Sequence, residues 1–260
     1  DLPTNSFPTT QSEVQQTWAA LYTGIYRAND FLERILNKIG SYTTTDKKLA
    51  TLYIAEARAL RGMFYFELVR RFGNVVLMTS TQMSNQNPAT YVQSAPEKVY
   101  EYIEDDLLYA CDILPYATDD QYRESNDYRF SKGAALGLLT KVYATWAGYP
   151  VKDESKWEAA AKTARILVES GKHGLLKDYE QLWKNTCNGT WDPTESLIEI
   201  SFYSPTVSGN SDPVGRIGKW NGVKTTAIAG VRGSCAANVK VVHTFVLDWR
   251  EDVSDIRRDL

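Results

Sequence analysis

The side chains that could perform acid–base or metal chemistry are few in this 260-residue sequence. The two histidines, His173 and His243, lie far apart, and neither belongs to a zinc-binding spacing such as HExxH. The acidic pairs Asp105–Asp106 and Asp119–Asp120 contain the residue type that cleaves glycosidic bonds, but adjacency in sequence does not set the carboxyl separation that this reaction needs. We interpret the first pair as solvated charge on a helix face and the second as part of a turn. The serine-hydrolase, P-loop and dinucleotide motifs are absent, so the sequence predicts no catalytic residue, metal or cofactor.

Aromatic side chains are the more informative group. The sequence contains 7 Trp, 16 Tyr and 8 Phe, which together make 12% of its residues. Such rings either fill a core or present flat faces on which a ligand stacks. Trp18, Trp146 and Trp157 fall on apolar helical stripes, so we expect them in the core.

Composition indicates a globular protein and argues against some partners. Apolar residues make 43% of the chain, and the formal net charge of -3 comes without the basic block that a nucleic-acid backbone attracts. Cys111, Cys187 and Cys235 are odd in number and widely spaced, which fits neither a disulfide framework nor a metal knuckle. No stretch reaches the roughly 18 to 20 apolar residues of a membrane span, and the first residues are not a signal peptide. Because the chain lacks a basic block, we expect no nucleic-acid partner.

Apolar periodicity predicts five helices in the first 172 residues. Ser12, Ser94, Ser131 and Ser155 are the expected N-caps, because each precedes an apolar-periodic run. The starts of the first two helices lie about 34 residues apart, which is the period of a tetratricopeptide repeat. The predicted helices span residues 12–40, 46–72, 94–114, 131–146 and 155–171.

The second of these helices is apolar nearly all round, which indicates neighbours on several sides. Its charges must then be paired or extend to the rim of the helix. Glu67 is spaced for Arg70 or Arg71 on the same helix, and Glu56 needs an arginine from another helix.

The amino-acid composition changes after His173, where Asn, Gly, Thr, Ser and Pro become frequent. Residues 198–202 alternate at period two and predict a strand, and residues 242–249 predict a return to helix. The fold class expected from these patterns is mainly all-α: a tetratricopeptide-like scaffold of helical hairpins with an irregular, loop-rich segment that carries little β-structure.

Six sequence blocks follow one another in a recognisable order. They are YTGIYRANDFLERI (22–35), AEARALRGMFYFELVRRFGNVVLM (55–78), PEKVYEYIEDDLLYACDILP (96–115), RFSKGAALGLLTKVYATWA (129–147), WEAAAKTARILVESGKHGL (157–175) and ESLIEISF (195–202). In this order they resemble the SusD/RagB family, and DWREDVSDIRRDL (248–260) resembles the segment that follows them in that family. Their order along the chain is a more specific signal than any single motif. One departure is Val75–Val76, because many members carry a proline shortly after the Gly-Asn that ends the second helix.

The resemblance implies a non-catalytic lipoprotein, exposed at the cell surface of a Bacteroidetes-type bacterium and involved in polysaccharide utilization. Such a protein binds a glycan and delivers it to a SusC-like TonB-dependent transporter in the outer membrane, where an amino-terminal lipid anchor holds it. Family members are about twice as long as this chain, so we expect an amino-terminal portion that lacks the anchor. Residues 1–172 would form the tetratricopeptide-like scaffold, and residues 173–260 a loop-rich continuation of the same domain.

Glycan binding needs flat rings that stack on the C–H faces of sugars and polar groups that reach the hydroxyls. The first group of candidates lies in the loop-rich segment and comprises Trp183, Trp191, Tyr203 and Trp220. The second group lies in residues 74–94, a loop that the resemblance implicates in ligand binding, and comprises Asn85 and Tyr91.

Three alternatives stay open from the sequence. Each candidate ring has the alternative role of covering the edge of the scaffold. For the whole chain, the alternatives to glycan binding are a helical-repeat adaptor that binds another protein and a helix-rich glycoside hydrolase.

Overall fold

The computed structural model describes residues 11–120, 128–200, 224–228, 234, 236–237, 241–251 and 254–255. Contacts divide the chain into two compact units. Unit 1 contains Asp1–Leu176 and Trp191–Glu199, and unit 2 contains Lys177–Thr190 and Ile200–Leu260. The boundary expected near residue 172 lies close to this division, and the assignment of both parts to one domain stays a prediction.

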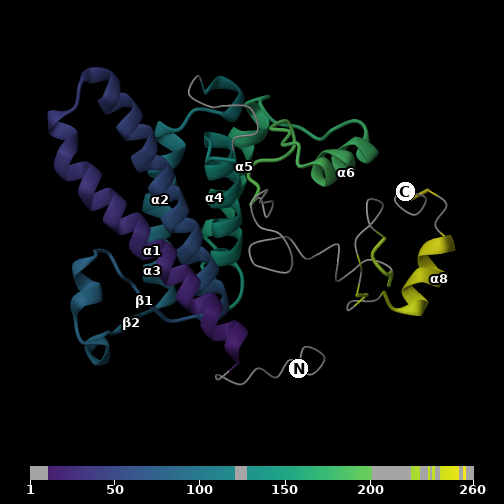
Figure 1. Cartoon of the computed structure of the whole chain (residues 1–260), viewed down its shortest axis with the longest axis horizontal. Helices are drawn as coiled ribbons and strands as arrows, with labels where there is room; N and C mark the ends of the chain where they lie inside the picture. Colours follow the sequence, from purple (N-terminus) through teal and green to yellow (C-terminus); the bar gives the residue numbers. More distant parts are fainter. Residues whose placement is uncertain are drawn as a thin grey trace. The chain divides into compact units, whose positions relative to one another are not determined.

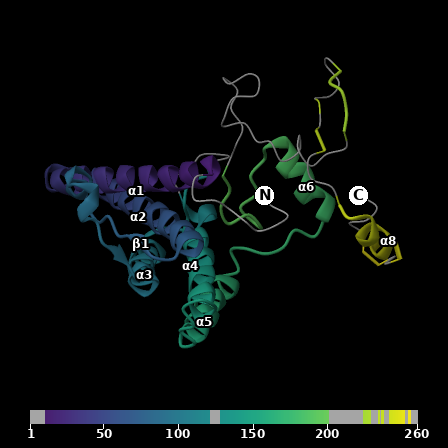
Figure 2. The same cartoon turned by 90° about the horizontal axis from the view of Figure 1, so that it is seen from below.

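Five helices form the scaffold of unit 1, and each packs mainly against the next along the chain (Figures 1 and 2). This succession confirms the expected mainly helical fold with paired neighbouring helices. The elements are α1 (Ser12–Lys38), α2 (Thr44–Phe72), α3 (Pro96–Ile113), α4 (Lys132–Ala147) and α5 (Lys156–Glu169), with short 3-10 helices at η2 (Ile39–Ser41) and η5 (Ala117–Asp119).

One of the predicted N-caps is confirmed, and two others are not. Ser131 caps α4 by accepting a hydrogen bond from the amide of Ala134 at 3.2 Å, as predicted. Ser12 is already helical and makes no cap bond, so its predicted role was wrong. The prediction that Ser94 caps α3 was also wrong. Helix α3 begins at Pro96, because the fixed φ of proline suits the first helical position. Ser94 pairs in a short strand instead.

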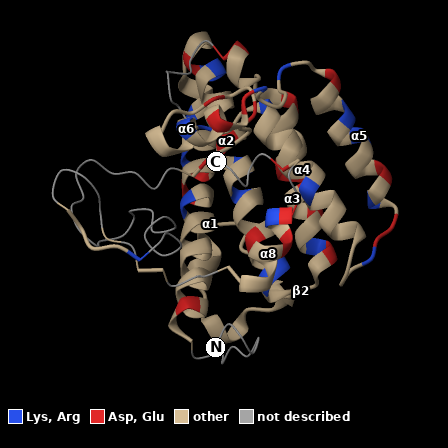
Figure 3. Cartoon of the chain, turned by 90° about the vertical axis from the view of Figure 1, so that its right-hand side faces the viewer, with Lys and Arg blue, Asp and Glu red and all other residues tan. Residues whose placement is uncertain are grey.

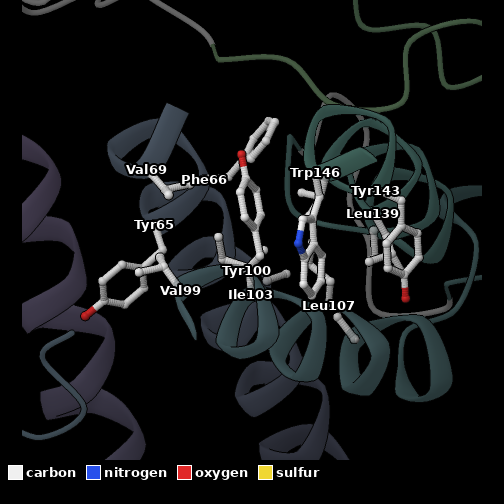
Figure 4. Close-up of a cluster of buried hydrophobic side chains, with 14 of the residues drawn as sticks. Tyr65, Phe66, Val69, Val99, Tyr100, Ile103, Leu107, Leu139, Tyr143 and Trp146 are labelled. Carbon is white, nitrogen blue, oxygen red and sulfur yellow. The ribbon is translucent and has the colours of Figure 1, made fainter. Parts of the chain in front are cut away.

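The core of unit 1 lies where α2, α3 and α4 meet (Figure 4). Tyr100 and Trp146 stack with ring centroids 5.3 Å apart and an interplanar angle of 14°. Trp146 is 4% exposed, which confirms its predicted burial. Trp157 is 52% exposed, so its assignment to the core was wrong, and Trp18 is only half-buried. A position on an apolar stripe of an outer helix therefore did not ensure burial.

The two acidic side chains interpreted as one solvated pair have different environments. Asp105 is exposed, but Asp106 is fully buried and pairs with both Arg58 and Arg61 at 2.8 Å. The interpretation was wrong for Asp106, because its face of α3 packs on α2 rather than facing water.

The ion pair predicted within α2 is present, and the arginine that pairs with Glu56 lies just before α4 rather than on a helix. Glu67 pairs with Arg70 at 2.7 Å within the helix, and Glu56 accepts a hydrogen bond from Arg129 Nε at 3.0 Å from the segment before α4. Figure 3 shows both basic and acidic residues along α5. The Glu56–Arg129 pair thus ties α2 to the segment before α4, whereas Glu67 pairs within α2.

A short sheet holds the segment that follows α2. Strand β1 (Val75–Val76) pairs antiparallel with β2 (Gln93–Ser94), with Val75 opposite Ser94. Between the strands lie two 3-10 helices, η3 (Gln82–Asn85) and η4 (Pro88–Thr90). The strand expected at residues 198–202 was wrong for residues 198–200, which are irregular, and residues 201–202 lie outside the described residues.

Unit 2 contains α6 (Tyr179–Asn188) and α8 (His243–Glu251). Helix α8 confirms the prediction for residues 242–249. Helix α6 was not predicted; Asp178 caps it by accepting from the amides of Glu180 and Gln181, and Gly189 ends it in the left-handed conformation. Within the described parts of both units, no helix has the length and apolar run that a membrane span requires.

Candidate ligand-binding site

The segment between β1 and β2, residues 77–92, lies against α1 and encloses a pocket with it; we call this segment the site loop and the hollow the loop pocket. The pocket has a volume of about 250 Å³. Five lining residues come from α1, and the others come from β1 and the site loop. The lining residues are Trp18, Tyr22, Ile25, Tyr26, Asn29, Val76, Met78, Ser84 and Tyr91.

The α1 side of the pocket follows from helical spacing. Trp18, Tyr22, Tyr26 and Asn29 recur every three or four residues and therefore share one face of the helix. Trp18, which the sequence assigned to an apolar stripe in the core, lines the pocket together with Ile25. Tyr22, Tyr26 and Asn29 lie beside that stripe at helical spacing, so the rest of the wall could have been found in the sequence.

The rings of the loop pocket have their polar ends directed to the backbone. The Tyr22 hydroxyl donates to the Val76 carbonyl at 2.8 Å, and the Tyr91 hydroxyl donates to the Met83 carbonyl at 2.7 Å. Burial raises the pKa of Tyr22 to about 12, against a smaller lowering by its bond to Val76, so this hydroxyl remains a donor at neutral pH. Trp18 packs at 4.9 Å from the Tyr22 ring, and Tyr26 is 46% exposed. Aromatic side chains therefore form much of the pocket wall.

The amide side chains of the site loop lie toward solvent. Asn85 ends η3 and is exposed, as are Gln86 and Asn87. Asn87 uses its side-chain oxygen to accept from the Ala89 amide at 3.0 Å. Tyr91 thus contributes to the pocket itself, and Asn85 lies on the exposed edge of the same loop.

Unit 2 contains a second aromatic hollow, which we call the α6–α8 pocket. It has a volume of about 820 Å³, and Trp183 in its wall is 52% exposed. The rings of Tyr179 and Trp183 meet edge to face with centroids 6.3 Å apart. Phe245 and Trp249 line the α8 side.

The other residues of the first candidate group do not join Trp183 there. Trp191 is 8% exposed and packs in unit 1 beside Tyr128, with centroids 6.2 Å apart. Because its faces are covered, the structure gives no support to stacking by Trp191, and its role in a site stays a prediction. Tyr203 and Trp220 lie outside the described residues.

Asp106 and His173, for which the sequence predicted no catalytic role, are held by other parts of the chain. The Asp106 carboxylate is engaged by two arginines, and the imidazole Nδ1 of His173 lies 2.8 Å from the Pro193 carbonyl oxygen. Among the described residues, no three His, Cys, Asp or Glu side chains are grouped to hold a metal. What the described surface offers to a ligand is stacking and hydrogen bonding.

Comparison with known proteins agrees with this architecture. The family whose description is starch-binding associating with outer membrane matches residues 3–144, which is more than half of the chain. The crystal structure of a SusD homolog from Bacteroides thetaiotaomicron superposes with a TM-score of 0.93 and 99% identity, over 100% of this chain and 48% of that chain.

Two more distant relatives are also described as SusD-like proteins. A SusD-like protein of Bacteroides ovatus is 27% identical over 217 residues, which cover 78% of this chain and 38% of that protein. A solved structure described as a laminarin-binding SusD-like protein is 31% identical with a TM-score of 0.52, over 66% of this chain and 35% of that one. The chain thus spans less than half the length of these relatives. The family match and the shared fold show that the chain belongs to the SusD/RagB family.

Proposed function

We propose that this chain is part of a non-catalytic glycan-binding protein and that the loop pocket is its contribution to the ligand site. The observation that carries the proposal is the aromatic wall that Tyr22, Tyr26 and Tyr91 give the pocket, because the family of this chain is described as starch-binding. The laminarin-binding relative supports a glucan or a similar polysaccharide as the ligand.

The chemistry of the pocket suits a sugar ring. Flat aromatic faces stack on the C–H faces of a pyranose, and the exposed amide of Asn85 lies on the same loop to reach hydroxyls. The volume of about 250 Å³ is below the roughly 300 to 1,000 Å³ of pockets that enclose drug-sized ligands. We infer that one sugar residue enters the pocket while the rest of the glycan stays outside.

The cellular setting is part of the same proposal. The family description supports association with the outer membrane. We infer exposure at the cell surface, a lipid anchor on the full-length protein, and delivery of the glycan to a SusC-like TonB-dependent transporter. We further propose that both units belong to one domain of that protein.

Affinity electrophoresis of the full-length protein on starch, laminarin and mucin glycans tests the function, with reducing ends assayed in parallel. We expect retardation by one polysaccharide without release of reducing ends. Release of reducing ends would instead indicate a hydrolase. Failure of every glycan, together with capture of a protein partner, would indicate an adaptor.

Four variants locate the site. Tyr91→Ala removes a ring from the loop pocket, and Tyr91→Phe keeps the ring while losing the bond to Met83. We expect the alanine variant to weaken binding about tenfold or more, as aromatic anchors of interfaces do, and the phenylalanine variant to keep most of the affinity. Trp183→Ala tests the α6–α8 pocket, and Tyr149→Ala, at an 83% exposed ring, is the control. Loss of affinity only in Trp183→Ala would move the site to unit 2.

A further inference from the structure

We propose that Glu33 is a positioning residue that holds the site loop against α1, so that the loop pocket exists before a ligand arrives. This inference rests on the proposed function of that pocket. Glu33 does not line the pocket, and it acts through Thr81, the residue that precedes η3. Its carboxylate accepts from the Thr81 amide at 2.8 Å and from the Thr81 hydroxyl at 2.5 Å.

Glu33 completes a series of bonds from the scaffold to the site loop and its first strand. Tyr22 donates to the Val76 carbonyl at 2.8 Å, and Asn29 donates to the Met78 carbonyl at 2.9 Å. From α2, the Tyr65 hydroxyl accepts from the Met78 amide at 2.7 Å and donates to the Met78 carbonyl at 2.8 Å. The start of the loop is therefore fixed by backbone contacts to two helices.

The spacing on α1 explains how one helix can serve a whole segment. Tyr22, Asn29 and Glu33 differ by seven and four residues, so they lie on one face of the helix at rising positions along it. They contact Val76, Met78 and Thr81 in the same order. The site loop thus runs along α1, and Glu33 makes the last of these contacts before η3 begins.

Glu33 is the member of the series that can be tested separately. Tyr22 and Asn29 line the pocket, and Tyr65 is fully buried in the core. Asn29 also accepts from Arg61 at 2.7 Å, so its removal would disturb the buried charges. Glu33 is half-buried, and its carboxylate accepts both of its hydrogen bonds from Thr81 of the site loop.

The physical consequence is preorganisation. Beyond the two-residue pairing of β1 and β2, the site loop has no sheet to hold it. A loop that must be ordered on binding subtracts conformational entropy from the affinity, whereas a loop already fixed does not. Removal of the Glu33 carboxylate should therefore free η3 and Tyr91 without emptying any part of the core.

The experiment compares Glu33→Ala, Glu33→Gln and Asp30→Ala in the full-length protein. Asp30 is a matched control, because its carboxylate lies on the same helix and pairs within it to Arg34 at 2.7 Å. Three quantities are measured: hydrogen exchange of residues 79–91 without ligand, affinity for the polysaccharide that retards the parent, and the denaturation midpoint. For Glu33→Ala we expect faster exchange in that segment and affinity lowered about tenfold, with little change in the midpoint.

Rescue separates positioning from a general structural role. Glu33→Gln keeps an acceptor for the Thr81 amide, so its exchange and affinity should stay within about twofold of the parent. If hydrogen exchange in Glu33→Ala equalled that of the parent, the inference would be overturned. It would also be overturned if the parent bound a polysaccharide and Glu33→Ala bound it with the same affinity. If the parent binds no polysaccharide, the proposed function fails, and the exchange of residues 79–91 still decides whether Glu33 holds the loop.

Discussion

Arg61 and Asp106 form a buried two-pronged ion pair between α2 and α3. Arg61 Nε lies 2.8 Å from Asp106 Oδ2, and Arg61 Nη2 lies 2.8 Å from Asp106 Oδ1. The third contact of the guanidinium, from Nη1 to Asn29 Oδ1 at 2.7 Å, extends the network to α1. Since Asn29 also donates to the Met78 carbonyl, this buried charge cluster connects three helices to the start of the site loop.

Removal of the buried carboxylate should be strongly destabilising. In Asp106→Ala, Arg61 keeps its charge in a buried position without its counterion, and such losses cost about 3 to 5 kcal/mol. Asp112→Ala removes an exposed carboxylate from the same helix and should change the free energy of unfolding by less than about 0.5 kcal/mol. Urea denaturation of both variants checks this, and equal losses would contradict the structural role given to Asp106.

Two phenylalanines on α2 separate burial from residue type. Phe66 is 1% exposed in the core, whereas Phe64 is only half-buried beside Gly24 of α1. Phe66→Ala should cost about 3 to 5 kcal/mol, because it removes a fully buried ring. Phe64→Ala should cost clearly less, since part of its ring already faces solvent. Denaturant titrations of the pair give the comparison, and a larger loss for Phe64→Ala would place the core elsewhere.

Alkaline pH should weaken the fold partly through Tyr22. Its pKa rises from an ordinary value of 10.0 to about 12, chiefly by burial, so the unfolded chain loses this proton first. Its contribution to stability is therefore complete below about pH 10 and is lost as the pH rises through about 12. The urea midpoint of the parent should fall across this range, and that of Tyr22→Phe should fall less. The urea midpoint of Tyr149→Phe, at an exposed ring, should fall as much as that of the parent. If the midpoint of Tyr22→Phe fell equally, the burial assigned to Tyr22 would be wrong.

The sequence was sufficient for the scaffold because its helices are long and periodic. The pairing of Glu56 and Glu67 with arginines also followed from the lack of a polar face on α2. The burial of Asp106 did not, since a helix face is known to be solvated only when its neighbours are placed. Helix α6 escaped prediction because it is short: Tyr179, Leu182 and Trp183 recur at helical spacing, but over only ten residues and inside a segment rich in Asn, Thr and Gly.

The candidate site was predicted only in part. Resemblance pointed to the loop with Asn85 and Tyr91, because family motifs surround it. The α1 wall with Tyr22 and Tyr26 was missed, since the apolar stripe of that helix had already been assigned to the core. The face of α1 that meets the loop is marked by hydrogen bonds of Tyr22, Asn29 and Glu33 to residues some 50 positions later, and contacts at such a separation leave no local pattern in the sequence.

Tryptophan fluorescence can report which pocket a ligand enters. Trp18 lines the loop pocket, with its ring 4.9 Å from those of both Tyr22 and Phe72, whereas Trp183 lines the α6–α8 pocket. A sugar that stacks in the loop pocket changes the polarity around Trp18, so binding should shift the emission of the parent. Trp18→Phe should lose most of this shift while the protein still binds in electrophoresis, and Trp183→Phe should retain it. The opposite pattern would assign the ligand to unit 2 and would separate the proposed glycan-binding function from the site loop.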